Sequence, residues 1–151
     1  MKDFIISLQT LLHGWATIKF KSCERELVYN ISHIASDALS CLVCSALNVI
    51  QNKPYQTKFY LEPDYLTCEV TPHNGEVCIL IGDTYFSCDK KRYARQILKL
   101  FDGYIFSHSI EEYATQWYYD YPQNAVEQLR DQLRKDTRCL SKHNPSANCS
   151  F

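Results

Sequence analysis

Three stretches of alternating apolar and polar side chains, divided by one amphipathic segment, constrain the fold of this chain most. Apolar residues occupy every second position over 16–20, 27–31 and 66–70, which is typical of half-buried strands. Between them, the apolar residues of 37–51 lie within one arc of about 140° at 100° per residue, which predicts a helix. Strand-rich and helical segments are therefore expected in separate runs.

The other elements are predicted from the same patterns. Residues 3–13 carry Phe4, Leu8 and Leu11 at helical spacing, which predicts an N-terminal helix that stops at Gly14. Asn74-Gly75 indicates a hairpin between two further strands. We also expect a strand at 58–61, strands at 66–71 and 77–81, and helices that begin at Asp89, Ser109 and Pro122, the first of them ending at Gly103.

This order predicts an α+β domain. The expected architecture is a mostly antiparallel sheet of about five strands, packed with N-terminal, central and C-terminal helices. The length of 151 residues suits one domain, and the 46% hydrophobic content is enough for a core. We assign residues 1–138 to this domain and residues 139–151 to a flexible C-terminal tail.

Eight cysteines are unusual for a chain of this size. A disulfide framework needs an oxidising compartment, but the apolar run at 4–8 is broken by Gln9 and Thr10, and no small-residue cleavage site follows. No run of apolar residues is long enough for a membrane span. The sequence therefore predicts a cytoplasmic protein with reduced thiols, and no membrane partner.

Cys41 and Cys44 form the one C-x-x-C pair. A structural zinc site needs a second pair of ligands, and a redox pair is expected at the first turn of a helix. Neither condition is met here, so a structural role is favoured and no metal or cofactor is predicted. A thiol- or metal-dependent enzyme or regulator that uses this pair is kept as the alternative.

Catalytic motifs are not evident in the sequence. There is no G-x-S-x-G elbow, and four glycines leave no phosphate-binding loop. We therefore expect that the protein is not an enzyme. The net charge of −1 also disfavours a dedicated nucleic-acid-binding domain, which usually carries a basic excess.

Charge is distributed in blocks along the chain. Residues 54–88 hold five carboxylates against one lysine, and residues 100–127 hold five carboxylates with no lysine or arginine. Residues 89–99 lie between them, with five basic side chains against one aspartate. Acidic surfaces steer the association of basic partners and help to set specificity.

An aromatic run at 117–121 lies within the second acidic block, and Tyr and Trp are favoured at interfaces. Tyr118, Tyr119 and Tyr121 cannot all point the same way, so at least one of them is expected on the surface. The candidate binding residues are Glu62, Asp64, Glu69, Glu76, Asp83, Glu111, Glu112, Tyr118, Tyr119 and Asp120.

Several short motifs occur together in a suggestive order over residues 8–134. They are Leu11-Leu12 before Trp15-Ala16-Thr17-Ile18, then Ser36-Asp37-Ala38-Leu39, Phe59-Tyr60-Leu61-Glu62-Pro63, and finally Tyr113-x-x-x-Trp117 before Tyr121-Pro122. In this order they resemble small bacterial immunity proteins of polymorphic-toxin and contact-dependent growth inhibition systems.

That resemblance implies a cytoplasmic protein that binds and neutralises one cognate toxin domain. A nuclease toxin would be basic because it holds phosphate, and the acidic and tyrosine-rich residues would complement it. The resemblance does not identify the toxin, and the cysteines are not part of the pattern. A homo-oligomeric structural protein is a further alternative.

Overall fold

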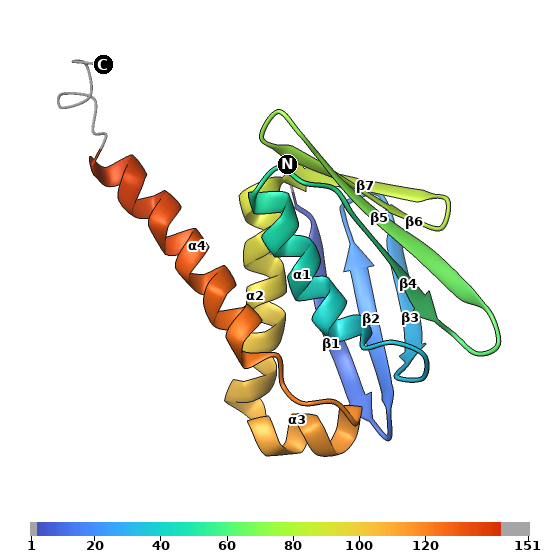
Figure 1. Cartoon of the computed structure of the whole chain (residues 1–151). Coiled ribbons are helices and arrows are strands. Elements are labelled where there is room, and N and C mark those ends of the chain that lie inside the picture. Colours follow the sequence, from blue (N-terminus) through green and yellow to red (C-terminus); the bar gives the residue numbers. More distant parts are fainter. Residues whose placement is uncertain (1–2, 143–151) are drawn as a thin grey trace.

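The computed structural model describes residues 3–142 and confirms the α+β class (Figure 1). Its seven strands are all antiparallel to their neighbours. The elements are β1 Ile5–Leu12, β2 Trp15–Lys21, β3 Glu26–Ser32, α1 Ala38–Ile50, β4 Tyr55–Tyr60, β5 Tyr65–His73, β6 Glu76–Ile81, β7 Thr84–Asp89, α2 Lys90–Ser107, α3 Ile110–Trp117 and α4 Gln123–Lys142.

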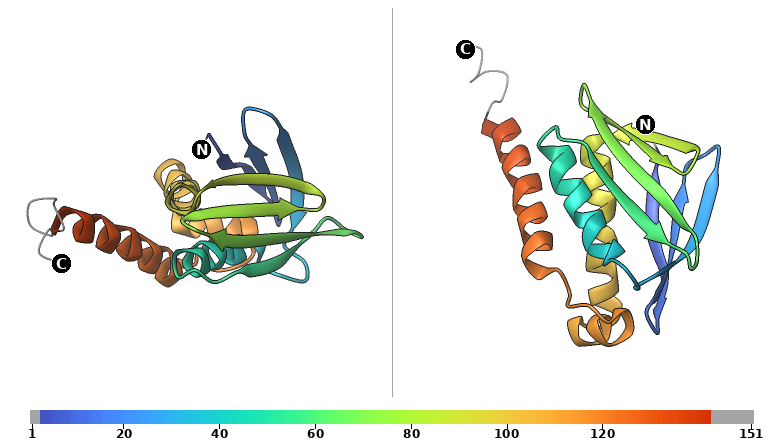
Figure 2. Two further views of the ribbon diagram at one scale, coloured as in Figure 1. Left: turned by 90° about the horizontal axis from the view of Figure 1, so that it is seen from above. Right: turned by 45° about the vertical axis from the view of Figure 1, so that its right-hand side comes forward.

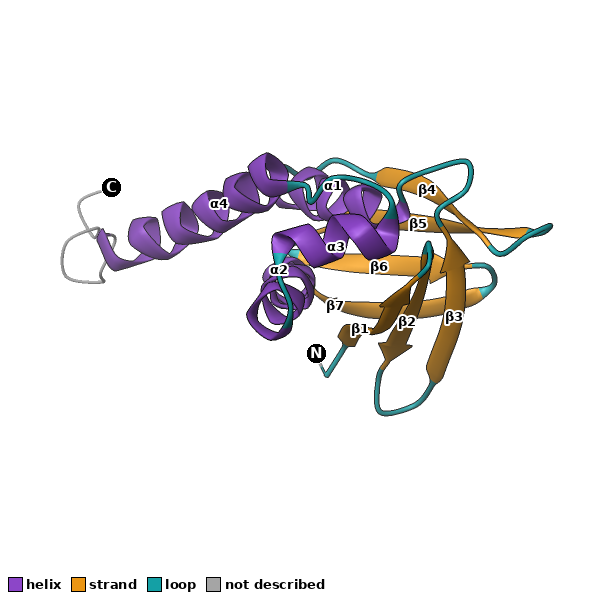
Figure 3. Cartoon of the chain, turned by 90° about the horizontal axis from the view of Figure 1, so that it is seen from below, coloured by secondary structure: helices purple, strands orange, loops and turns teal. Residues whose placement is uncertain are grey.

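The strands form two sheets rather than one. Sheet A has the order β1-β2-β3, and sheet B has the order β4-β5-β6-β7. Figure 3 shows that the strands of sheet A cross those of sheet B, and that the helices gather on one side of them. Each sheet is a simple meander, because every strand pairs with its neighbour in the sequence.

The predicted N-terminal helix is wrong, because β1 occupies that segment. A β-bulge between Leu8 and Thr10 inserts Gln9 into the strand, and this shifts the alternation by one position. The buried positions Phe4 and Leu11 and the half-buried Leu8 therefore fall at spacings of four and three, which imitate a helix. The pairing with β2 and the burial of Ile6 beside exposed Ile5 distinguish the strand from a helix.

The core lies where the inner faces of both sheets meet α1 and α2. Phe20 of β2 stacks on Phe59 of β4, with ring centroids 6.1 Å apart, and Phe4 meets Phe86 of β7 edge-on at 5.4 Å. Helix α1 begins as predicted at Asp37, whose carboxylate accepts the Ser40 amide at 3.2 Å. Burial of these rings is the main stabilising contribution to such a core.

Sheet B contains one strand that the sequence patterns did not suggest. Strand β7 follows the Gly82-Asp83 turn, and its buried Phe86 and Cys88 alternate with exposed neighbours. Asp89 then caps α2 as expected, by accepting the Lys91 amide at 3.3 Å. The expected end at Gly103 is wrong, since α2 continues through this residue to Ser107.

The last two helices begin close to the predicted places. The Ser109 hydroxyl accepts the Glu112 amide at 3.0 Å and opens α3, and α4 follows Pro122. Helix α4 packs on α1 and α2 and then projects past them (Figure 2). It extends to Lys142, into the segment expected as a tail, and residues 143–151 lie outside the described residues.

Candidate functional site

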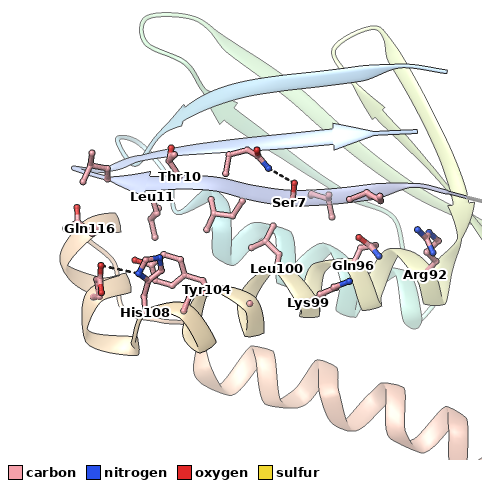
Figure 4. Close-up of a pocket in the computed structure, with 18 residues that line it drawn as sticks. Ser7, Thr10, Leu11, Arg92, Gln96, Lys99, Leu100, Tyr104, His108 and Gln116 are labelled. Atoms are coloured by element: carbon pink, nitrogen blue, oxygen red, sulfur yellow. Dashed lines mark hydrogen bonds and ion pairs between the residues drawn. The ribbon is translucent and has the colours of Figure 1, made fainter. Parts of the chain in front are cut away.

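A groove of about 920 Å³ runs between strand β1 and helix α2, and α3 closes one end of it (Figure 4). Every residue of β1 contributes to its lining. Strand β1 and helix α2 run side by side on its two walls. We call it the β1–α2 groove.

The strand wall of the groove is a free sheet edge. Among the described strands, β1 pairs with β2 alone. In an antiparallel pair, every second residue directs its amide and carbonyl away from its neighbour. The outer edge of β1 therefore offers main-chain donors and acceptors to the groove on both sides of the bulge at Gln9. With eight residues at about 3.3 Å each, this edge is about 26 Å long.

The helix wall is one face of α2 over nearly its whole length. The lining positions recur at intervals of three and four residues and include Gln96, Lys99, Gly103, Tyr104 and His108. From Arg92 to His108 the helix rises about 24 Å at 1.5 Å per residue, which matches the length of β1. The two walls therefore suit an extended polypeptide.

The charge of the groove is uneven. Arg92 donates from Nε to the Phe4 carbonyl at 2.9 Å, and neither Arg92 nor Lys99 forms an ion pair with a carboxylate of the described residues. At the other end, His108 Nδ1 lies 3.3 Å from the Glu112 carboxylate. The half of the groove beside the start of β1 is therefore cationic.

The end of the groove at α3 is held by close packing. The Gln116 carbonyl accepts the Gly14 amide at 2.6 Å, and the Gln116 side chain accepts the His13 amide at 3.1 Å. Gly14 has a φ of +81°, and a Cβ there would lie 2.3 Å from Nδ1 of His33. The β1–β2 turn therefore requires glycine, and it fixes the strand edge against α3.

The acidic candidates of sheet B are not gathered in one place. The meander puts Glu62, Asp64 and Asp83 in turns at one end of the sheet, whereas Glu76 stands at the other end and Glu69 lies within β5. Among these side chains, the Glu62 carboxylate accepts a hydrogen bond from the buried Ser32 hydroxyl and thereby ties β3 to the β4–β5 turn. Asp64 and Asp83 are exposed, and we call these two residues the acidic turns.

The candidates near α3 form a separate group, away from the turns of sheet B (Figure 1). Glu111, Glu112 and Asp120 are exposed, and Glu112 also lines the β1–α2 groove. Tyr118 is half-exposed and contacts the His33 ring edge-on at 4.8 Å. The Tyr119 hydroxyl donates to the His33 carbonyl at 2.7 Å, so this tyrosine joins α3 to the end of β3.

The Cys41 and Cys44 thiols lie half-buried on α1. Burial raises the pKa of the Cys44 thiol, and Cys41 and Asp37 raise it further through unfavourable charge interactions. A raised pKa disfavours the thiolate, which is the form that reacts and binds metals. Among the described residues, no three His, Cys, Asp or Glu side chains gather where they could hold a metal ion.

No family model, curated protein or solved structure matches this chain. In the described part of the chain, no helix combines the length and apolar character that a bilayer crossing needs.

Parts of the groove, but not the groove itself, can be recognised in the sequence. Arg92 and Lys99 were seen only as members of a basic run, and β1 was expected to be a helix without a strand edge. The spacing of Arg92, Gln96 and Lys99 along the expected helix is a signal that could reveal a second, polar face.

Proposed function

We propose that this chain is an immunity protein that binds and neutralises a toxin domain in the bacterial cytoplasm through protein–protein contact, without catalysis of its own. The observation that carries the proposal is the β1–α2 groove, in which a free strand edge and a parallel helix face extend for about 24 Å. Main-chain groups of a strand edge recognise another polypeptide chain, as in β-strand addition.

The motif order described above supports the immunity role within the wider class of protein-binding domains. The exposed acidic turns, Asp64 and Asp83, support a basic partner such as a nuclease. Carboxylates near the rim of an interface raise association rates with a basic protein and make binding sensitive to salt.

The test is co-expression with each toxin domain that is found encoded beside the gene for this chain. We expect restored growth and a stoichiometric complex whose affinity falls as ionic strength rises. A catalytically inactive form of the toxin domain allows the complex to be measured separately from toxicity. Failure of rescue together with absence of a complex would reject the proposed function.

A further inference from the structure

We propose that the β1–α2 groove binds an extended acidic segment of the partner protein, which adds to sheet A as a fourth strand beside β1. The identity of that partner rests on the proposed function, whereas the mode of binding rests on the geometry of the groove. The segment would pair its main chain with the free edge of β1 and direct alternate side chains towards α2.

The length of the groove defines the length of the segment. About seven extended residues at about 3.3 Å each span the distance from Arg92 to His108. Both walls are present over this whole distance, since β1 and α2 line the groove together.

The charge of the groove defines the chemistry of the segment. Arg92 and Lys99 have no carboxylate partner among the described residues, and they lie on the groove face of α2. Arginine and lysine at such a wall favour a segment with a carboxylate near the start of β1. The Glu112 carboxylate at the far end disfavours a second acidic residue there.

Gly103 gives a second, independent reason to expect an occupant. A glycine within a helix is destabilising relative to alanine, yet Gly103 is an exposed helical residue that lines the groove. A Cβ at this position would meet no atom within 4 Å, so the packing of the chain itself does not require glycine. An added strand that approaches the α2 backbone closely would require it.

The experiment selects peptides from a displayed library of random seven-residue sequences on the wild-type full-length chain. Each enriched peptide is then synthesised with a fluorescent label, and its affinity is measured by anisotropy. We expect enriched peptides with carboxylates at alternate positions towards one end. Enrichment of no peptide, or of peptides without acidic residues, would overturn the proposal.

Matched variants place the binding site. Gly103→Gln should raise the melting temperature and weaken peptide binding at least tenfold, because it fills the groove without disturbing the core. Phe106→Gln introduces the same side chain on α2 at a position that is 93% exposed and does not line the groove, and should leave binding unchanged. Equal binding to both variants would contradict the proposal.

A second pair of variants tests the charge. Lys99→Gln should weaken peptide binding several-fold and reduce its salt dependence. Arg95→Gln removes the same charge one turn away, outside the groove, and should leave peptide binding unchanged. Peptides methylated at alternate main-chain nitrogens test strand addition directly. One of the two methylated series should lose binding and the other should keep it, while equal loss or equal retention would reject strand pairing.

The outcomes separate this inference from the proposed function. Peptide binding at the groove without growth rescue would support the mode of binding and reject the toxin as partner. Growth rescue without peptide binding would support the toxin as partner and reject the mode of binding. A concentration-dependent dimer that Gly103→Gln abolishes would identify a second copy of the chain as the occupant, and would overturn the proposal.

Discussion

The β1–α2 groove and the acidic turns of sheet B are surfaces of two different kinds. The groove joins residues 5–12 to residues 92–116 and offers main-chain groups along a defined direction. The acidic turns place two exposed carboxylates, Asp64 and Asp83, at the end of a meander. The first kind of surface defines how a partner chain lies, whereas the second mainly affects how fast a partner arrives.

The largest expected effect concerns the turn that fixes one end of the groove. Gly14→Ala should lower the free energy of unfolding by about 2–4 kcal/mol, because the residue keeps a positive φ and its Cβ collides with His33. Gly75→Ala is the matched change in sheet B, where φ is +84° but no atom lies within 4 Å of the added Cβ. It should cost only about 1–2 kcal/mol.

Urea denaturation of the two variants measures this difference. If both variants lose the same free energy of unfolding, His33 moves aside freely. The end of the groove would then be no more firmly held than the β5–β6 turn of sheet B.

The next effect tests the acidic turns as a steering surface. The double change Asp64→Asn with Asp83→Asn should slow association with the toxin domain up to about tenfold at low salt, and should leave the dissociation rate nearly unchanged. Glu24→Gln with Glu26→Gln removes the same charge from the β2–β3 hairpin and serves as the control. Stopped-flow association rates at several salt concentrations distinguish the two double variants. A change in the dissociation rate alone would contradict a role of the acidic turns in steering association.

A smaller effect is expected from the groove wall itself. Gly103→Ala should raise the free energy of unfolding by about 1 kcal/mol, because alanine has the higher helix propensity and the added Cβ has free space. This sign is opposite to that of Gly14→Ala, because Gly103 lines the groove with free space beside it, whereas the turn at Gly14 is packed against His33. A destabilised Gly103→Ala protein would show that the chain needs glycine for its own packing.

The smallest expected effect is the reaction of the thiols of the folded chain with a labelling reagent at neutral pH. Burial raises the pKa of Cys68 and of Cys88 to about 12, so neither thiol should react before the chain unfolds. Among the cysteines whose surroundings the structure describes, exposed Cys23 should react first. Mass spectrometry of the labelled chain checks the order, and fast labelling of Cys44 would favour the thiol-dependent regulator instead of a binding protein.

The sequence was informative where the pattern is local. Helix α1, strands β2 and β3, the β5–β6 hairpin and the cap at Ser109 depend on neighbouring residues, and each was predicted. Strand β1 was not, because the bulge at Gln9 gives its buried residues a helical spacing. The groove depends on that strand and on a helix about 85 residues further on, so charge runs alone could not reveal it.

Amide hydrogen exchange on the complex with the toxin domain tests the central claim most directly. If the groove holds a partner strand, amides of β1 that face away from β2 should gain protection on binding, and the backbone of the β4–β5 and β6–β7 turns should change little. Protection confined to those turns, with exchange in β1 unaltered, would contradict the account.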